Sequence, residues 1–296
     1  MKNNFVLFCV LFFSGLFFFA SCSDEGVNAV AYSLRSTGSN MGGDTIVPPV
    51  KEDRTITVEG VEFTMKYIEG GTFWMGAQST NPTGQNYDSL ADIDESPVHQ
   101  VTLILDCLVG ETEVTQALWE AVMGTNPSYY CEADRGSHPV EQVCWNDVKT
   151  FINKLNALTG LTFRLPTDAE WEYVARGGNL SKGYLFSGSN TIGEVAWYVK
   201  NCADHSHPVG KKAPNELGLY DMSGNVWEWC EDDFHENFDG APPDGSAWID
   251  NPRNAERIQR GGGWAVMSSD CRIADRHHLL SDQSSKIIGF RLVLVQ

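Results

Sequence analysis

The stretch from Asn215 to Cys230, NELGLYDMSGNVWEWC, combines turn formers, carboxylates and large aromatic side chains. Pro214 and Gly218 interrupt a helix, so the apolar residues that follow are expected to enter a turn. Four residues of that turn can direct side-chain or backbone oxygens to a common point: Asp221, Gly224, Val226 and Glu228. Calcium takes about six to eight oxygen ligands of these kinds. The spacing therefore predicts a calcium site.

A tight turn without a metal is the alternative for the same residues. In that interpretation Trp227 and Trp229 simply fill the hydrophobic core, as large aromatic side chains commonly do. From the local chemistry alone, the turn without a metal is the favoured interpretation.

The segment DMSGNVWEW resembles the signature of the formylglycine-generating enzyme family, also called sulfatase-modifying factors. Further segments of the chain are similar to that family in the same order: GGTFWMG (70–76), ESPVHQVTL (95–103), EVTQALWEAVMG (113–124), RLPTDAEWEYVARGG (164–178), RGGGW (260–264), CRIADR (271–276) and GFRLV (289–293). The resemblance covers roughly residues 55–296. It implies an α+β, C-type-lectin-like fold in a single domain with much irregular structure.

The resemblance also implies an activity, the oxidation of a sulfatase cysteine to formylglycine with oxygen and copper(I). In the family two cysteine thiolates hold the copper, and soft thiolates are the ligands that copper(I) prefers. Here those two positions are Val266 and Cys271, and a serine of the family's active site aligns with Gly263. Since valine has no donor atom, we expect no bis-thiolate copper site, and we expect Cys271 to be a buried or disulfide-bonded thiol.

Other residues near these positions were considered as site residues. Trp227 matches a tryptophan of the family's substrate cleft, although a core tryptophan would look the same. Met267, His277 and His278 have side chains that suit copper. Adjacent side chains of an extended segment point to opposite faces, so Met267 is not expected to replace the missing thiol at Val266.

For calcium, the resemblance supports the turn described above. Asp221, Gly224, Val226 and Glu228 match the family's second calcium site position by position, with Asp221 in place of an asparagine. The first calcium site looks eroded, because its loop is shortened to residues 201–207 with Asp204 as the sole carboxylate.

The N-terminus predicts export and a lipid anchor. A basic Lys2 precedes the apolar run from Phe5 to Ala20, which is typical of a signal peptide over residues 1–21. Small residues directly before Cys22 resemble a bacterial lipobox and predict lipidation of that cysteine; ordinary secretory cleavage is the alternative. Residues 22–54 are expected to form a flexible tether to a domain at 55–296. We expect anchoring in the outer membrane, with the acidic residues after Cys22 pointing weakly to surface exposure.

The net charge and the cysteine content limit the partners and the compartment expected for this protein. The 21 basic against 39 acidic residues give a net charge of −18, which disfavours nucleic acid as a partner. The mature chain would keep six cysteines for an oxidising compartment, and six allow 15 disulfide connectivities. Buried thiols are expected for most of them.

The pattern of apolar residues predicts the main elements. A strand pair is expected over 55–68 and a strand over 98–105. Helices are expected from Thr115 to Gly124, from an N-cap at Asn146 to Gly160, and from the Thr167–Glu170 capping box to Gly177. The polar segment 81–94, with Glu95 after it, is expected to be a solvated acidic loop.

The leading hypothesis is a lipid-anchored envelope protein that binds a protein partner or ligand, or assists assembly, without copper oxidation. One alternative is a formylglycine-generating oxidase that acts on a sulfatase peptide through Cys271 and an unrecognised second ligand. The other alternative is a lectin-like module that binds a glycan through Trp227, Trp248 and Trp264.

Overall fold

The domain opens with a β-hairpin, as the alternating sequence predicts. In the computed structural model, which describes residues 51–104, 106–130 and 135–296, β1 (Arg54–Val58) pairs antiparallel with β2 (Val61–Ile68). Glu59 and Gly60 form the turn, with φ angles of 49° and 82°. The signal peptide, Cys22 and nearly all of the tether lie outside the described residues.

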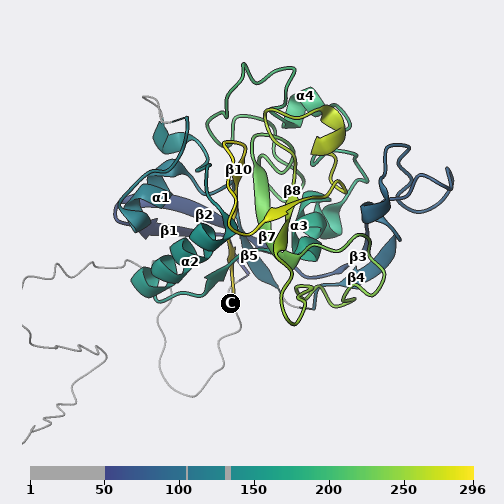
Figure 1. Cartoon of the computed structure of the whole chain (residues 1–296), viewed down its shortest axis with the longest axis horizontal. Coiled ribbons are helices and arrows are strands. Elements are labelled where there is room, and N and C mark those ends of the chain that lie inside the picture. The colour runs from purple at the N-terminus through teal and green to yellow at the C-terminus, as the bar shows by residue number, and fades with distance from the viewer. Residues whose placement is uncertain (1–50, 105, 131–134) are drawn as a thin grey trace, which may run out of the picture. The chain divides into compact units, whose positions relative to one another are not determined.

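Three sheets organise the described chain (Figure 1). The five-stranded sheet has the order β1-β2-β5-β11-β6, the four-stranded sheet β10-β7-β8-β9, and β3 and β4 form a hairpin. The remaining strands are β3 (Thr72–Met75), β4 (His99–Thr102), β5 (Cys107–Gly110), β6 (Phe163–Arg164), β7 (Trp227–Asp233), β8 (Glu256–Arg260), β9 (His277–Leu280), β10 (Ile288–Gly289) and β11 (Val293–Leu294).

The helices are α1 (Gln116–Met123), α2 (Trp145–Thr159), α3 (Asp168–Ala175) and the single turn α4 (Ile192–Val195). Thr115 caps α1 and Gly124 ends it in the left-handed conformation, as predicted. The capping box of Thr167 and Glu170 is also confirmed. The predicted cap of α2 is wrong: Cys144 is the N-cap residue, because the Asp147 side chain accepts a hydrogen bond from its N–H.

Helices α1 and α2 pack against the five-stranded sheet through a stack of aromatic rings. The ring of Trp119 lies 5.1 Å from that of Phe151 and 6.1 Å from that of Phe290. Helix α3 packs against β7 and β8, which places its residue Trp171 in the second core cluster of the domain. The mixed α+β fold of the prediction is confirmed.

The segment 81–94 is largely an exposed loop, as predicted, but the adjoining Glu95 is buried and pairs with an interior arginine. Arg272 donates hydrogen bonds to both oxygens of Glu95 (2.6 and 2.9 Å) and to Asp88 Oδ2 (2.9 Å). Glu95 is fully buried. A buried arginine requires such partners, and no local pattern indicates that an arginine 177 residues further along supplies the pairing.

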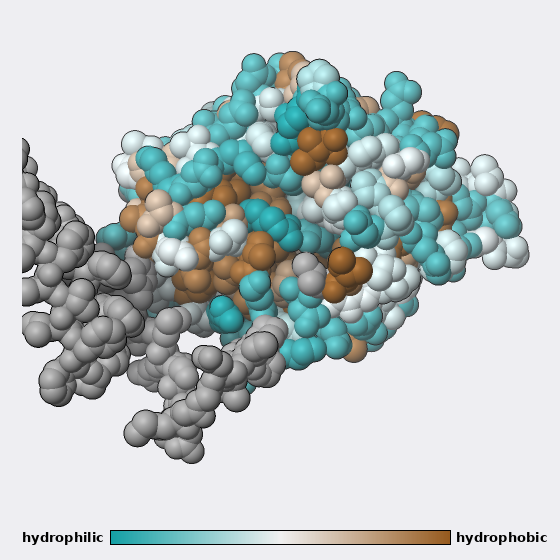
Figure 2. Space-filling view, turned by 90° about the horizontal axis from the view of Figure 1, so that it is seen from below, coloured by the Kyte–Doolittle hydropathy of each residue, from teal (hydrophilic) through white to brown (hydrophobic). Residues whose placement is uncertain are grey.

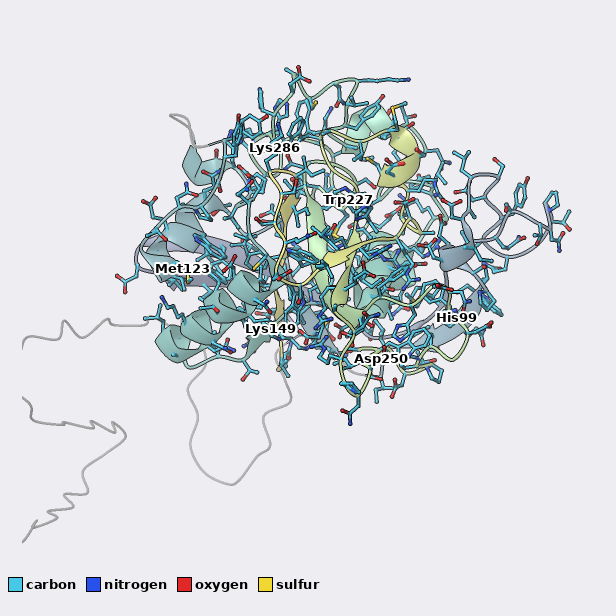
Figure 3. All side chains as sticks on the ribbon, in the orientation of Figure 1. His99, Met123, Lys149, Trp227, Asp250 and Lys286 are labelled. Atoms are coloured by element: carbon cyan, nitrogen blue, oxygen red, sulfur yellow. The ribbon has the colours of Figure 1, made fainter. Side chains whose placement is uncertain are left out.

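The arginines of the C-terminal motifs all lie in the interior. Arg260 pairs with Asp168 and Glu172 of α3, and Arg276 pairs with Asp168. Figure 3 shows the side chains of the described residues on the ribbon. These arginines and their carboxylate partners hold α3, β8 and the last quarter of the chain together by buried, charge-assisted hydrogen bonds.

Part of the hydrophobic surface is left in water. Figure 2 shows hydrophobic side chains in patches on one face of the domain, between hydrophilic ones. Ile104 and Val295 are exposed, and both line a cavity of about 830 Å³. No helix in the described part of the chain is long and apolar enough to cross a membrane.

Candidate functional site

The turn from Asp221 to Glu228 adopts an unusual backbone before it enters β7. Asp221, Gly224 and Asn225 have φ angles of 56°, 81° and 60°. A Cβ atom on Gly224 would lie 2.3 Å from the carbonyl oxygen of Trp197, so only glycine fits there. Asn225 is buried and bonds to His207 on one side and to Glu113 on the other. The turn is therefore fixed by its neighbours.

Glu228 has no free oxygen in this arrangement. Arg291 donates to Oε2 from Nε and to Oε1 from Nη2, both at 2.6 Å, and Trp171 Nε1 donates to Oε2 at 2.7 Å. Arg291 also donates to the carbonyls of Gly110 and Tyr220. Glu228 thus forms a fully buried, bidentate ion pair.

Asp221 is different, because one of its oxygens has no partner outside the pair that it forms with Glu113. Its Oδ2 accepts a hydrogen bond from the N–H of Gly210 (2.7 Å), while Oδ1 accepts none from the other described residues. The neighbouring Glu113 is in the same state: Oε1 accepts from Asn225 and Oε2 is buried without another partner in the described chain. Two adjacent buried carboxyl groups therefore each have one oxygen without a donor from a third residue of the described chain, and a hydrogen bond joins the two carboxyl groups.

The pKa values of this pair are raised. Burial, followed by the charges of Asp221 and Glu228, raises the pKa of Glu113 well above its usual range. Burial raises the pKa of Asp221 to about 6. Two such groups in contact cannot both be ionised unless a cation lies between them; otherwise they share a proton.

The predicted calcium ligands fit this geometry in part. Asp221 offers a free, buried oxygen, whereas both oxygens of Glu228 are committed to Arg291 and Trp171. No three or more His, Cys, Asp or Glu side chains within the described ranges are arranged to hold a metal. A cation at this place would rely on Asp221, Glu113 and backbone carbonyls.

The thiol of Cys271 lies in an apolar cluster. Its closest companions are Phe186 and Val195, with Val266 packed against them. Cys271 is completely buried, and a Cβ on Gly262 would lie only 2.7 Å from its Sγ. Burial raises the pKa of the thiol far above its usual range. A thiol in such surroundings is unreactive.

Val266 and Cys271 are thus neighbours in space as well as in the motif. Val266 is partly buried and packs against the apolar cluster that contains Cys271. Met267, the next residue, is exposed. Val266 and Met267 lie in a turn that leads into a 3-10 helix rather than in the extended segment expected, and they differ in exposure.

The histidines considered as copper ligands have other partners. The ring of His277 lies 5.1 Å from that of Trp227, and its Nδ1 is 3.1 Å from Gln259 Oε1. His278 stacks on Phe234 at 3.7 Å and lies 3.2 Å from Glu256. Neither belongs to the cluster around Cys271.

The three tryptophans considered for glycan binding lie in separate groups. Trp227, at the start of β7 near the centre of the domain (Figure 3), is buried in the main core. Trp264 is buried against Cys202 and Val226. Trp248 stacks on His235 at 3.6 Å. The tertiary structure does not assemble them into one aromatic cleft.

The shortened loop at residues 201–207 carries histidines where the first calcium site would need carboxylates. His207 stacks on Trp197 at 3.8 Å, and its ring is 4.6 Å from that of His205. Asp204 contributes its backbone carbonyl to the hydroxyl of Tyr130. Burial lowers the pKa of His207, which favours the neutral form of this ring.

Five cysteines lie in the described part of the chain, and all five are free, buried thiols: Cys107, Cys144, Cys202, Cys230 and Cys271. The expectation of buried thiols is confirmed for these positions. Cys131 lies outside the described residues.

Sequence reasoning missed two residues of the candidate site. Glu113 belongs to the motif EVTQALWEAVMG and Arg291 to GFRLV, but neither residue was predicted to belong to the site. The one available signal was an acidic residue directly before the Val114–Thr115 start of a helix, in a segment that is otherwise buried. Nothing local linked that residue to Asp221.

Comparisons with known proteins point to one family. Residues 57–295 match the model of the sulfatase-modifying factor enzyme 1-like domain. The chain is 32% identical over 238 residues to the chaperone protein LppX of Paenibacillus barcinonensis, covering 62% of this chain and 80% of that one. It is 35% identical over 173 residues to the formylglycine-generating enzyme of Streptomyces coelicolor, covering 53% of this chain and 52% of the enzyme.

Solved structures of similar proteins have the same fold. Treponema denticola variable protein 1 is 33% identical, with a TM-score of 0.69 and coverage of 83% of this chain and 99% of that chain. PvdO from Pseudomonas aeruginosa is 26% identical, also with a TM-score of 0.69, over 79% of this chain and 94% of the other. The predicted fold is confirmed by these neighbours.

Proposed function

Because this chain belongs to the sulfatase-modifying-factor family, we propose that it uses the family's fold to bind a partner in the cell envelope and does not oxidise sulfatase cysteines. The observation that carries the proposal is the pairing of Val266 with Cys271. Copper(I) needs two soft ligands, and in this place the structure offers one buried thiol facing apolar groups.

The state of the thiol supports the same conclusion. A copper ligand must lose its proton, whereas burial keeps Cys271 protonated by raising its pKa. The side chains that could substitute for a second thiol are turned away or paired elsewhere, as the exposed Met267 and the His278–Glu256 contact show.

A binding or assembly role is further supported by a relative. The LppX protein is named a chaperone, and this chain covers 80% of its length. We extend that kind of role to this chain, with lipidation at Cys22 anchoring it in the outer membrane.

We also propose a structural calcium ion at the turn. The unsatisfied oxygens of Asp221 and Glu113 support it, because two buried carboxyl groups side by side favour a bound cation or a shared proton. The cation would neutralise two buried carboxylates and so stabilise the turn. Glu228 contributes through Arg291 to the fold.

The decisive experiment offers the purified protein a sulfatase-type peptide that contains CxPxR, with copper(I), reductant and air. The expected result is no conversion, read as the absence of the mass loss and of aldehyde trapping. The formylglycine-generating enzyme of Thermomonospora curvata, 34% identical over 217 residues, serves as the positive control. Turnover by the wild-type protein would replace this proposal with the oxidase alternative.

A further inference from the structure

A cavity of about 740 Å³ lies beside the β3–β4 hairpin, and Cys271 is not among the residues that line it. Its walls come from β3, from the two arms of the 78–98 loop, and from Asn237 and Asp239. In Figure 1 the hairpin stands at the opposite end of the domain from α1 and α2. The volume falls within the range of about 300–1,000 Å³ typical of small-molecule sites.

Trp74 forms one wall of this cavity, and packing does not explain its position. In β3, Phe73 and Met75 point toward the interior, so Trp74 points outward. It is 41% exposed, and its partner across the hairpin is the exposed Gln100. A tryptophan on the outer face of a two-stranded hairpin places a large flat apolar surface in water.

The opposite wall is held rigid by side-chain hydrogen bonds. Gln78 Oε1 accepts from the N–H groups of Thr80 (3.0 Å) and Asn81 (2.7 Å), while its Nε2 donates to Asn81 O (2.9 Å). Asn86 Nδ2 donates to the carbonyls of Trp74 and Gly76, both at 2.8 Å. These bonds fasten the loop to β3, so the cavity exists before any ligand arrives and binding requires little ordering.

The remaining lining groups are amides, hydroxyls and carboxylates. Beside Trp74 and Ile93 the walls carry Gln85, Ser96 and Asn237, together with Asp92 and Asp239. No lysine or arginine is among the described residues that line the cavity. Amides and hydroxyls both donate and accept hydrogen bonds, whereas two carboxylates without a cation repel an anionic ligand.

We propose that this cavity binds a neutral oligosaccharide, with the C–H face of one pyranose ring packed on Trp74. A sugar ring combines an apolar face with a rim of hydroxyl groups, and the cavity offers a flat aromatic wall next to donors and acceptors. Sulfated or uronic-acid sugars are excluded by Asp92 and Asp239. This inference rests on the binding role proposed above and names a ligand for it. Sugar binding is measured without copper, so its failure is distinguishable from a failure of the proposal that the protein is not an oxidase.

The test uses the soluble chain from residue 23 onward, screened against neutral gluco-, galacto- and mannotrisaccharides and their sulfated counterparts. The best neutral sugar is then titrated by calorimetry. We expect binding of at least one neutral trisaccharide, at least ten-fold weaker binding by Trp74→Ala, and partial recovery with Trp74→Phe. Tyr129→Ala, which removes another exposed aromatic side chain outside the cavity, serves as the matched control and should bind like wild type.

A charge-reversal variant tests whether the carboxylates of the cavity exclude anionic sugars. Asp239→Lys should allow the sulfated trisaccharide to bind, since it places a cation on the wall. The proposal fails if no neutral sugar binds, if Trp74→Ala binds as tightly as wild type while remaining folded by circular dichroism, or if a peptide library yields the sole ligands.

Discussion

Arg291 holds Glu228 through two parallel hydrogen bonds of 2.6 Å, from Nε to Oε2 and from Nη2 to Oε1, with both side chains buried. The two residues come from the family motifs NVWEW and GFR. Their pairing changes how the turn must be tested. A substitution of Glu228 disturbs a buried ion pair whether or not calcium binds nearby.

Glu228→Ala should destabilise the domain by about 3–5 kcal/mol, because it leaves the Arg291 guanidinium buried without its counter-charge. Urea unfolding of wild type and variant measures the change. Glu69→Ala, which removes an exposed partner of Lys51, is the control and should change the free energy of unfolding by less than about 1 kcal/mol. Equal effects of the two substitutions would show that the buried pair does not stabilise the fold.

The calcium proposal predicts that EDTA lowers the melting temperature and that added calcium restores it. Binding to the folded state alone adds about 2.7 kcal/mol at a calcium concentration 100-fold above Kd. The variant with Asp221→Asn and Glu113→Gln should lose this response.

Asp239→Asn, a change at an exposed carboxylate, should keep the wild-type response to EDTA. If the wild-type melt is insensitive to EDTA and elemental analysis finds no calcium, then the Glu113–Asp221 pair holds a proton.

Val266→Cys with Gly263→Ser should create tight copper(I) binding where wild type has none. Val266 packs in the cluster of Cys271, so a thiol there completes a two-thiolate site. A Cβ on Gly263 meets its nearest atom, the carbonyl oxygen of Ile287, at 3.4 Å, and serine therefore fits. Copper(I) is titrated against a chelator without oxygen.

Met267→Cys is the matched control for that variant, since it adds a thiol to the adjacent, exposed position. Tight binding by the wild-type protein, or equal binding by both cysteine variants, would contradict the assignment of Val266 to the lost ligand position.

Glu141 predicts a pH dependence of stability. Its Oε1 accepts from the N–H of Tyr130 (2.8 Å), its Oε2 has no partner in the described chain, and burial raises its pKa to about 7 despite the opposing charge of Lys286. The unfolded chain releases this proton near pH 4.5 and the folded chain near pH 7. Stability from this group is therefore complete below pH 4.5 and lost as pH rises to 7, by about 1.4 kcal/mol per unit of pKa shift.

Glu141→Gln cannot ionise, so the difference between wild type and variant should move in favour of the variant from pH 5 to pH 8. Chemical denaturation at both pH values gives that difference and cancels the other titrating groups. A difference that stays constant with pH would show that Glu141 titrates normally.

Lipidation at Cys22 predicts that Cys22→Ala is released from the membrane fraction or accumulates unprocessed. The reason is that a lipid chain attached to this cysteine is the proposed anchor. Fractionation after a high-salt wash is the measurement, with Ser23→Ala as the control. Full retention of the Cys22 variant on membranes would overturn the lipobox interpretation.

The sequence by itself determined where several helices begin and end, because these boundaries depend on residues close together in the chain. Thr115 and Gly124 bound α1, and Thr167 with Glu170 begins α3, because caps depend on residues within one helical turn. The replacement at Val266 is also a sequence fact, since no fold can give valine a donor atom.

Tertiary structure decided which groups meet. The bonds from Asn225 to Glu113 and from Arg291 to Glu228 join residues 112 and 63 positions apart. Pairings at such separations follow from how three sheets pack, and no local pattern encodes them. For that reason the sequence analysis assigned Glu228 as a metal ligand, grouped separate tryptophans into one cleft, and predicted Glu95 to follow a solvated loop. In the folded chain, Glu228 and Glu95 are buried and paired with arginines. Trp74 faces an open cavity.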